Sequence, residues 1–389
     1  MYSMIWFVLI IFVIYTLLIG AFALAQWRLL LYKPQYTKKS IGFSILIPFR
    51  NEALNLPSLL QAIAQLEYPT DHYEILLIND DSQDTSLDIV NTFIASHTYL
   101  NIVCIHSVRT SGSPKKDALA LGVQQSQYDW IVTTDADCVF PSAWLSTLNS
   151  FIQEKQPKMV AGPVAITTTS TPSFANAFEQ LDSLSLMGAT MGGFGLKMPF
   201  MCNGAHLAYE KKAFIEQEGF SKNTHIASGD DHFLLEKFTK AYPHHVQYLK
   251  SPQAIVTTQA QKSWKDLISQ RIRWASKASA YNFWFSKAVG LLVLLANLLT
   301  VVFLIFIPLL VFSDFAFAKA KPLPLLTLSL FLKWAVDYIL IARNAYFFNR
   351  KSFLKYYPIL LILYPFVNLY ITIRSLFFTY EWKGRRFSK

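Results

Sequence analysis

The sequence is poor in charge, in cysteine and in the glycine patterns that bind phosphates. Only 15% of its 389 residues are charged and 53% are hydrophobic, whereas soluble domains carry about 25% charged residues. This balance excludes an ordinary soluble enzyme and a disordered chain. Cys104, Cys138 and Cys202 lie too far apart for a disulfide scaffold or a zinc ribbon. No G-x-G-x-x-G follows the first expected strand and no G-x-x-x-x-G-K-[ST] occurs, so dinucleotide and P-loop sites lack their signatures.

Uncharged apolar runs lie towards both ends of the chain. Residues 1–27 are long enough to span a bilayer as a helix. A cleaved signal peptide is the alternative, but the run has no basic start. Basic residues follow it instead, namely Arg28, Lys33, Lys38 and Lys39. We therefore predict an uncleaved membrane helix with its basic end in the cytosol.

Two further membrane helices are expected at residues 288–313 and 323–342. Charges inside membrane segments often have a function. Lys333 and Asp337, however, are four residues apart on one helix face, which favours a mutual ion pair.

Residues 356–378 form a fourth apolar run that contains Pro365. If this run spans the membrane, counting places the basic tail, residues 379–389, outside, against the positive-inside rule. A re-entrant or interfacial hairpin broken at proline would return the tail to the cytosol. We prefer the hairpin to a spanning helix.

Residues 40–262 have the texture of a soluble α/β domain, because short β-branched runs alternate with helical stretches. Strands are expected at 43–48, 73–78, 102–105 and 130–134, and helices at 52–66, 85–97 and 117–125. The pattern predicts a largely parallel sheet flanked by helices, in the doubly wound style. In such folds, ligands bind at the carboxyl ends of the strands.

Acidic residues stand where these strands should end. Asp80 and Asp81 follow one strand, and Asp135 and Asp137 follow another. A third pair, Asp230 and Asp231, opens a probable helix. Each cluster alone is more typical of a turn or a helix cap. Together they predict a site for a divalent cation, because crowded carboxylates repel one another and Mg²⁺ or Mn²⁺ relieves that repulsion.

Residues 263–287 are basic and rich in aromatic residues, which suits an amphipathic helix at the membrane surface. The segment contains Gln270, Arg273 and Trp274 as Gln-x-x-Arg-Trp. Read alone, Arg273 and Trp274 would be interface anchors.

The ordered set of Asp, Asp-x-Asp, Asp and Gln-x-x-Arg-Trp resembles membrane-bound family 2 glycosyltransferases. That family includes cellulose and hyaluronan synthases and ceramide glucosyltransferases. Residues 47–52 (IPFRNE) and 115–119 (KKDAL) also resemble its motifs. The resemblance covers residues 40–274 and the flanking helices. It implies an α/β, Rossmann-like GT-A domain in the cytosol, with transmembrane helices on its N-terminal and C-terminal sides in an integral membrane protein.

The resemblance also implies a role for each matching residue. In the nucleotide pocket of a UDP-sugar it places Pro48, Arg50, Glu52, Asp80 or Asp81, and Lys115. Asp135 and Asp137 would meet the diphosphate and its divalent metal. Asp231 is the expected catalytic base and Asp230 the alternative, because Asp-Asp stands where the family usually has Glu-Asp. Gln270, Arg273 and Trp274 would close over the diphosphate and the acceptor.

These roles describe an inverting glycosyltransferase. A metal at Asp137 and the Arg273 guanidinium would stabilise charge on the leaving diphosphate, and a carboxylate would take the acceptor's proton. A single displacement gives a β product from an α-linked UDP-sugar. The few membrane segments favour a lipid or lipid-linked acceptor over the channel that a processive polysaccharide synthase needs.

Other classes fit less well. A non-catalytic nucleotide-sensing membrane protein would not require all these acids together with Gln-x-x-Arg-Trp. The net charge of +10 could suit a nucleic-acid binder, but the basic residues gather near membrane ends and no RNA-recognition motif occurs. We expect no metal at the histidines, which lack ligand spacing and should occupy surface or cap positions: His206, His232, His244 and His245. Cys202–Gly204 either lines the acceptor cleft, as the resemblance suggests, or forms a tight turn.

Overall fold

The chain forms two compact units. The computed structural model describes residues 2–35, 39–168, 173–224, 226, 228–277, 280–312, 323–383 and 385–387, so Lys38 and part of the tail lie outside the described residues. The sheet domain comprises residues 29–170, 197–260 and 381–389. The helical unit comprises residues 1–28, 171–196 and 261–380.

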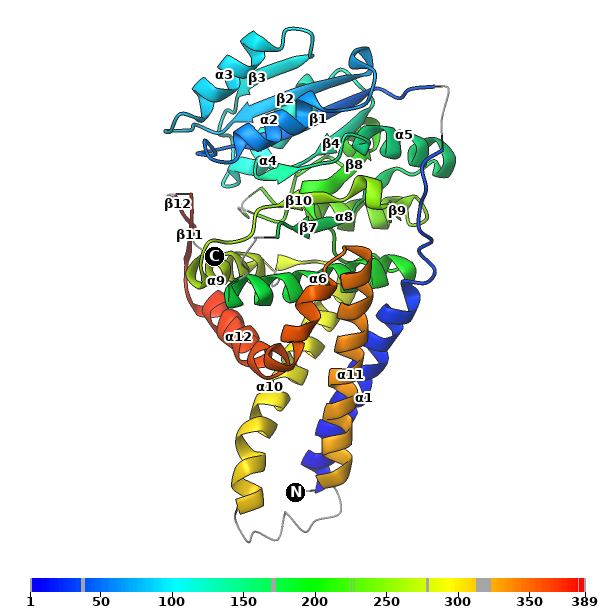
Figure 1. Cartoon of the computed structure of the whole chain (residues 1–389), viewed down its shortest axis with the longest axis vertical. Coiled ribbons are helices and arrows are strands. Elements are labelled where there is room, and N and C mark those ends of the chain that lie inside the picture. The colour runs from blue at the N-terminus through cyan, green and yellow to red at the C-terminus, as the bar shows by residue number, and fades with distance from the viewer. Residues whose placement is uncertain are drawn as a thin grey trace. The chain divides into compact units, whose positions relative to one another are not determined.

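The sheet domain is built on a seven-stranded sheet in the order β3-β2-β1-β4-β8-β6-β9 (Figure 1). Its strands are β1 (Phe43–Phe49), β2 (Tyr73–Asn79), β3 (Ile102–His106), β4 (Trp130–Thr133), β6 (Met159–Ala161), β8 (Leu207–Glu210) and β9 (Val246–Tyr248). The strands β1 to β4 are parallel and begin where the sequence predicts them. β8 is antiparallel to both neighbours, β4 and β6. The sheet is therefore mixed, and its parallel half carries the expected strands.

The remaining elements of the sheet domain are helices and short strands. The helices are α2 (Leu56–Ala64), α3 (Ser86–Ser96), α4 (Pro114–Gln125), α5 (Trp144–Lys155), α7 (Lys211–Glu216) and α8 (Asp230–Ala241), with 3-10 turns at Thr70–His72, Gly204–His206 and Pro252–Ala254. A second sheet pairs β5 (Cys138–Val139), β10 (Val256–Thr258) and β7 (Val164–Ile166), and a hairpin pairs β11 (Tyr380–Trp382) with β12 (Arg385–Phe387).

The core of this domain explains why the predicted strands form. β1 (FSILIPF) and β2 (YEILLIN) are buried along nearly their whole length, as strands covered on both faces should be. α4 packs closely on this sheet, because a Cβ added at Gly122 would lie 2.7 Å from the Ile78 side chain and 3.0 Å from that of Leu46. The sheet is thus held firmly where its strands end.

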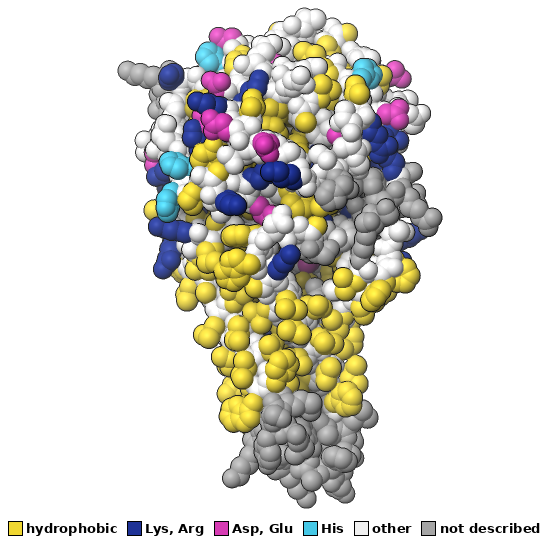
Figure 2. Space-filling view, turned by 180° about the vertical axis from the view of Figure 1, so that it is seen from behind, with side chains coloured by type: hydrophobic (Ala, Val, Ile, Leu, Met, Phe, Trp, Pro, Cys, Tyr) yellow, Lys and Arg dark blue, Asp and Glu magenta, His cyan; other side chains and the backbone are white. Residues whose placement is uncertain are grey.

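The helical unit contains α1 (Tyr2–Ala25), α6 (Phe174–Gly195), α9 (Trp264–Ser276), α10 (Trp284–Phe312), α11 (Leu323–Phe347), the 3-10 turn Lys351–Tyr356 and α12 (Tyr357–Phe377). Four segments are long and apolar enough to cross a membrane: Ile5–Ala25, Trp284–Phe306, Pro324–Phe347 and Lys351–Phe377. Hydrophobic side chains gather on the surface of this unit (Figure 2), and Leu17 and Phe331 are 68% and 64% exposed. Such surfaces are typical of lipid contact.

The compact units divide the chain differently from the domain expected at residues 40–262, because α6 belongs to the helical unit. Its glycines explain this, since a Cβ at Gly192 would lie 2.4 Å from Phe22 and one at Gly195 would lie 2.2 Å from the Ala25 carbonyl. These small residues let α6 pack closely against α1.

The fourth apolar run also differs from the expectation. α12 is continuous, with Pro365 inside it, so the proline-broken hairpin is not formed. Figure 1 shows α12 inclined to α11.

The predicted pair inside α11 is confirmed. Lys333 Nζ donates to Asp337 Oδ2 at 2.9 Å, and the Tyr15 hydroxyl of α1 donates to Asp337 Oδ1 at 2.7 Å. These polar groups satisfy one another inside the helical unit.

Candidate active site

Three parallel strands bring the predicted donor-site residues to one edge of the sheet. β1 pairs with β2 up to Phe49 and Asn79, and β1 pairs with β4 up to Leu46 and Thr133. The predicted donor-site residues at this edge are Pro48, Arg50 and Glu52 from the β1 end, Asp80 and Asp81 after β2, and Asp135 and Asp137 after β4. Segments far apart in sequence therefore share one rim, as the pattern predicted.

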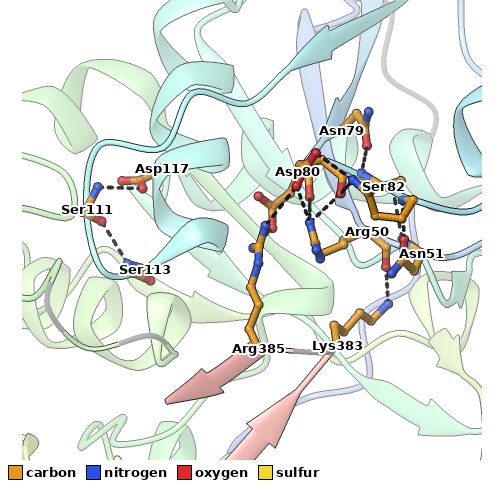
Figure 3. A network of polar contacts seen from close by, with 12 residues as sticks. Arg50, Asn51, Asn79, Asp80, Ser82, Ser111, Ser113, Asp117, Lys383 and Arg385 are labelled. Carbon is orange, nitrogen blue, oxygen red and sulfur yellow. Dashed lines mark hydrogen bonds and ion pairs between the residues drawn. The ribbon is translucent and has the colours of Figure 1, made fainter. Parts of the chain in front are cut away.

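Arg50 links the ends of β1 and β2 (Figure 3). Its Nη1 donates to the Asp80 and Asp81 carbonyls at 2.7 Å and 2.5 Å and to Asp81 Oδ2 at 3.2 Å. Its buried Nε has no hydrogen-bond partner within the described ranges. Buried donors are rarely left unpaired, so the protein atoms around Arg50 do not satisfy its side chain completely.

The loops at this rim are held in an uncommon backbone conformation. Asn51 has φ of 51° and Asp81 has φ of 57°, which few residues other than glycine adopt. Asn51 Oδ1 accepts from the Gln83 amide at 2.8 Å, and the Asn51 amide donates to Ser82 Oγ at 3.1 Å. Asn and Asp tolerate this conformation better than most residues, and the hydrogen bonds hold the two loops together at the rim.

Lys115, near the start of α4, joins two of the acidic clusters. Its Nζ lies 2.6 Å from Asp135 Oδ1 and 3.4 Å from Asp230 Oδ2. Burial lowers the pKa of this ammonium, but the Asp135, Asp230 and Asp231 carboxylates outweigh burial and hold the pKa well above its usual range. Lys115 is therefore a permanent cation between acids from β4 and α8.

The two aspartates at the start of α8 differ in environment. Asp230 is buried and paired with Lys115. Asp231 is partly exposed, and its carboxylate accepts from the Gly204 amide at 3.2 Å and the His232 amide at 2.7 Å. A Cβ at Gly204 would lie 3.1 Å from Asp230 Oδ2, so glycine keeps this corner of the site open.

Asp137 is the residue whose environment calls most clearly for a cation. Burial, and then the Asp135 and Glu52 carboxylates, raise its pKa to about 6, although Cys138 and Lys383 oppose the rise. A divalent cation would reverse this penalty. Among the described residues, no group of three metal-ligating side chains is assembled. The donor set instead fits Mg²⁺ or Mn²⁺ held by one or two carboxylates together with substrate phosphates.

Sequence reasoning missed two cations at this rim. From the C-terminal hairpin, Arg385 Nη1 lies 2.6 Å from Asp80 Oδ2, and Lys383 Nζ contacts the Glu52 carboxylate and donates to the Arg50 carbonyl at 2.7 Å (Figure 3). The basic character of the tail was visible in the sequence, but it was interpreted only as a sign of membrane orientation.

The Gln-x-x-Arg-Trp residues lie on α9, in the helical unit. The residue within this motif that sequence reasoning passed over is Arg271. It is buried, its Nε donates to Asp182 Oδ2 of α6 at 2.6 Å and its Nη1 donates to Gln270 Oε1 at 2.5 Å. Its guanidinium also lies 4.3 Å from the Trp274 ring centroid. Arg271 thus orients Gln270 and Trp274, while the role of Arg273 stays a prediction.

The expected placement of the histidines is half right. His244 and His245 are exposed, but His206 and His232 are buried. His206 Nε2 accepts from Trp144 Nε1 at 3.0 Å, and burial lowers its pKa to about 4. It is a core residue. At Cys202–Gly204, the Asn203 Oδ1 accepts from the Ala205 amide at 3.0 Å. This hydrogen bond forms the tight turn that was one of the two expectations for this segment.

Comparison with known proteins supports the family suggested by the motifs. Residues 44–215 match the family model described as "Glycosyl transferase family 2". This part of the chain is therefore a family 2 glycosyl transferase domain, and the resemblance noted in the sequence is confirmed there.

Curated relatives match over longer stretches. The probable glycosyltransferase YdaM of Bacillus subtilis is 28% identical over 235 residues, 60% of this chain and 54% of that protein. The poly-beta-1,6-N-acetyl-D-glucosamine synthase of Staphylococcus epidermidis is 25% identical over 251 residues, 64% of this chain and 57% of that protein. The chain thus matches little more than half the length of these relatives. The names of two other matching proteins refer to lipid phosphates. One names undecaprenyl-phosphate, and the other names a dolichyl phosphate that carries a sugar.

A solved structure shows the same fold. The mannosyltransferase PcManGT of Pyrobaculum calidifontis, in complex with GDP-Man and Mn²⁺, has a TM-score of 0.53 to this chain. The likeness covers 95% of this chain and 99% of that one at 16% identity. The α/β GT-A fold expected from the sequence is thereby confirmed.

Proposed function

We propose that this protein is an inverting glycosyltransferase that moves a sugar from a nucleotide-sugar, in the first instance a UDP-sugar, to a hydroxyl of a lipid or lipid-linked acceptor at the cytosolic membrane face. The observation that carries the proposal is the convergence of Lys115, Asp135 and Asp230 beside the half-buried Asp137. In a family 2 domain, such a cluster is suited to a nucleotide diphosphate with its metal.

The nucleotide end of the donor would lie against the β1 and β2 ends. Pro48, Arg50 and Glu52 line that side, and Asp80 or Asp81 can accept a hydrogen bond from the base. Asp81 is accessible to an incoming nucleotide, because its side chain is 71% exposed.

Asp135 and Asp137 would hold the divalent metal, which would offset charge on the departing diphosphate. Lys115, which contacts Asp135, adds a permanent positive charge near the diphosphate oxygens. Arg273, with Gln270 and Trp274, would approach the diphosphate from α9, as the resemblance implies.

Asp231 would accept the proton of the acceptor hydroxyl. It is the better base because Asp230 is already neutralised by Lys115, while Asp231 is partly exposed. One displacement inverts the anomeric centre, so an α-linked donor would give a β product.

The surface of the helical unit supports a lipid acceptor, because its candidate membrane spans expose large apolar side chains. The second candidate is a processive polysaccharide synthase. The Staphylococcus epidermidis relative, whose name is that of a polymer synthase, favours it.

The tail contacts bear on membrane orientation. Lys383 and Arg385 contact the sheet domain, so the tail would lie on the same side of the membrane as that domain. Three crossings, by α1, α10 and α11, would then leave α12 at the cytosolic interface. The basic residues Arg28, Lys33 and Lys39 after α1 agree with a cytosolic domain.

The proposal is tested with purified protein in detergent, labelled UDP- and GDP-sugars, Mn²⁺ or Mg²⁺ and a lipid extract. Transfer to a lipid product is expected, and Asp137→Ala and Asp231→Asn should each remove it. Asp129→Asn is the matched control, because Asp129 is an exposed aspartate of the same domain.

The product separates the candidates. A single-sugar lipid product supports the proposal, and a long polymer supports the synthase. Full turnover by Asp231→Asn would remove the base assignment, and no transfer from any donor would contradict the proposed activity.

A further inference from the structure

The C-terminal hairpin contacts the proposed donor site at the sheet edge, although the two are separated by almost the whole length of the sequence. Arg385 and Asp80 are 305 residues apart, and Lys383 and Glu52 are 331 apart. All four side chains are largely buried, with exposed fractions of 13–22%. Arg385 also lies 3.9 Å from Asp81 Oδ2. Solvent-exposed tails rarely make several such contacts with one site.

The balance of carboxylates and cations at the rim indicates a role for the contacts of Lys383 and Arg385. The rim without the tail carries more carboxylates than cations: Glu52, Asp80, Asp81, Asp135 and Asp137 against Arg50 and Lys115. Such a rim attracts a divalent cation but repels a diphosphate. Lys383 and Arg385 reduce the surplus where a nucleotide would enter.

Both cations keep hydrogen-bonding capacity for a ligand. A lysine ammonium has three donors, and among the described residues Lys383 directs two of them to the Glu52 carboxylate and the Arg50 carbonyl. An arginine has five N–H donors, and Arg385 directs Nη1 and Nη2 towards Asp80 and Asp81. Each can hold an acidic side chain and an anionic ligand together.

We propose that Lys383 and Arg385 are donor-binding residues, supplied by the hairpin to the nucleotide-sugar site. Lys383 supplies a positive charge beside Glu52 for the anionic part of the donor, and Arg385 positions Asp80 for the nucleotide. The inference rests on the proposed function and deepens it, because it makes the tail part of the site.

The test measures the affinity of the full-length protein in detergent for UDP and for GDP, each with MnCl₂, followed by donor KM and kcat. Lys383→Ala should weaken binding of the preferred nucleotide about tenfold or more, because a charge-assisted hydrogen bond is lost. Arg385→Ala should weaken it less. KM should rise with kcat nearly unchanged, and Lys383→Arg should restore most of the affinity.

The matched control is Lys212→Ala, which removes one positive charge from the same domain at a side chain that is 81% exposed. The inference is overturned if Lys383→Ala and Arg385→Ala bind nucleotide as the control does. It is also overturned if they bind more tightly, since the hairpin would then compete with the donor. A wild-type protein that binds neither nucleotide and transfers no sugar would overturn the proposed function and this inference together.

Discussion

Charged side chains are arranged differently in the sheet domain and in the helical unit. In the helical unit, charges are paired one to one, as Lys333 with Asp337 and Arg271 with Asp182. In the sheet domain, like charges are brought together at strand ends, and the pKa of Asp137 is raised to about 6 as a result. Paired charges serve structure, whereas a crowd of like charges is unfavourable until a ligand arrives. The contrast separates the residues that hold the fold from those that act.

The largest expected effect concerns Asp137. Asp137→Asn should lower turnover by about a thousandfold, because the metal loses a ligand. Without metal, the same variant should be more stable than wild type at pH 7. The ionised form of Asp137 is disfavoured in the fold, and that cost is present above pH 6 and absent below its ordinary pKa of 3.8.

Turnover and the thermal unfolding midpoint in EDTA check this prediction. A variant that is both active and less stable than wild type would show that Asp137 serves structure, and the comparison between the two units would fail.

The second prediction concerns the helical unit. Arg271→Ala should destabilise the protein by about 3–5 kcal/mol, because it leaves Asp182 buried without its partner. The double variant Arg271→Met/Asp182→Leu should recover most of that stability. Denaturant unfolding in detergent measures both, and an unchanged single variant would mean that the pair is not structural.

The third prediction concerns pH. Burial lowers the pKa of His206 to about 4, from 6.5. Stability should therefore fall as the pH drops from 6.5 to 4, by roughly 3 kcal/mol, because only the unfolded state binds the proton in this range. The experiment uses the Asp137→Asn background, since Asp137 acts with the opposite sign. Adding His206→Gln should remove the slope, and a slope that persists would contradict the assignment.

The smallest effect is expected for the pair in α11. A double-mutant cycle with Lys333→Met and Asp337→Leu should give a coupling of about 1 kcal/mol, the usual scale for polar contacts in membrane helices. Turnover should change little in either variant. A large loss of turnover with stability preserved would instead indicate a functional role for this pair.

Strand positions and the rim were predictable from sequence. Parallel strands place their carboxyl ends together, so Asp80 and Asp137 had to share an edge once β1, β2 and β4 were recognised. The exposed His244 and the pair Lys333–Asp337 follow from local patterns in the same way.

Other features depend on contacts that no local pattern encodes. The strand that carries Arg385 has only three residues and meets a partner 305 positions away. The glycines of α6 give no sign, in the sequence, of the α1 surface that they fit. Arg271 stands at an unspecified position of Gln-x-x-Arg-Trp, so the motif gives no sign that this side chain is buried.

Binding of Mn²⁺ followed by electron paramagnetic resonance, with and without UDP or GDP, tests the central claim most directly. If the carboxylates at the sheet edge hold a cation together with a nucleotide diphosphate, the nucleotide will tighten Mn²⁺ binding, and Asp137→Asn will abolish that gain. Equal nucleotide affinity in Mn²⁺ and in EDTA, unaffected by Asp137→Asn, would contradict the account.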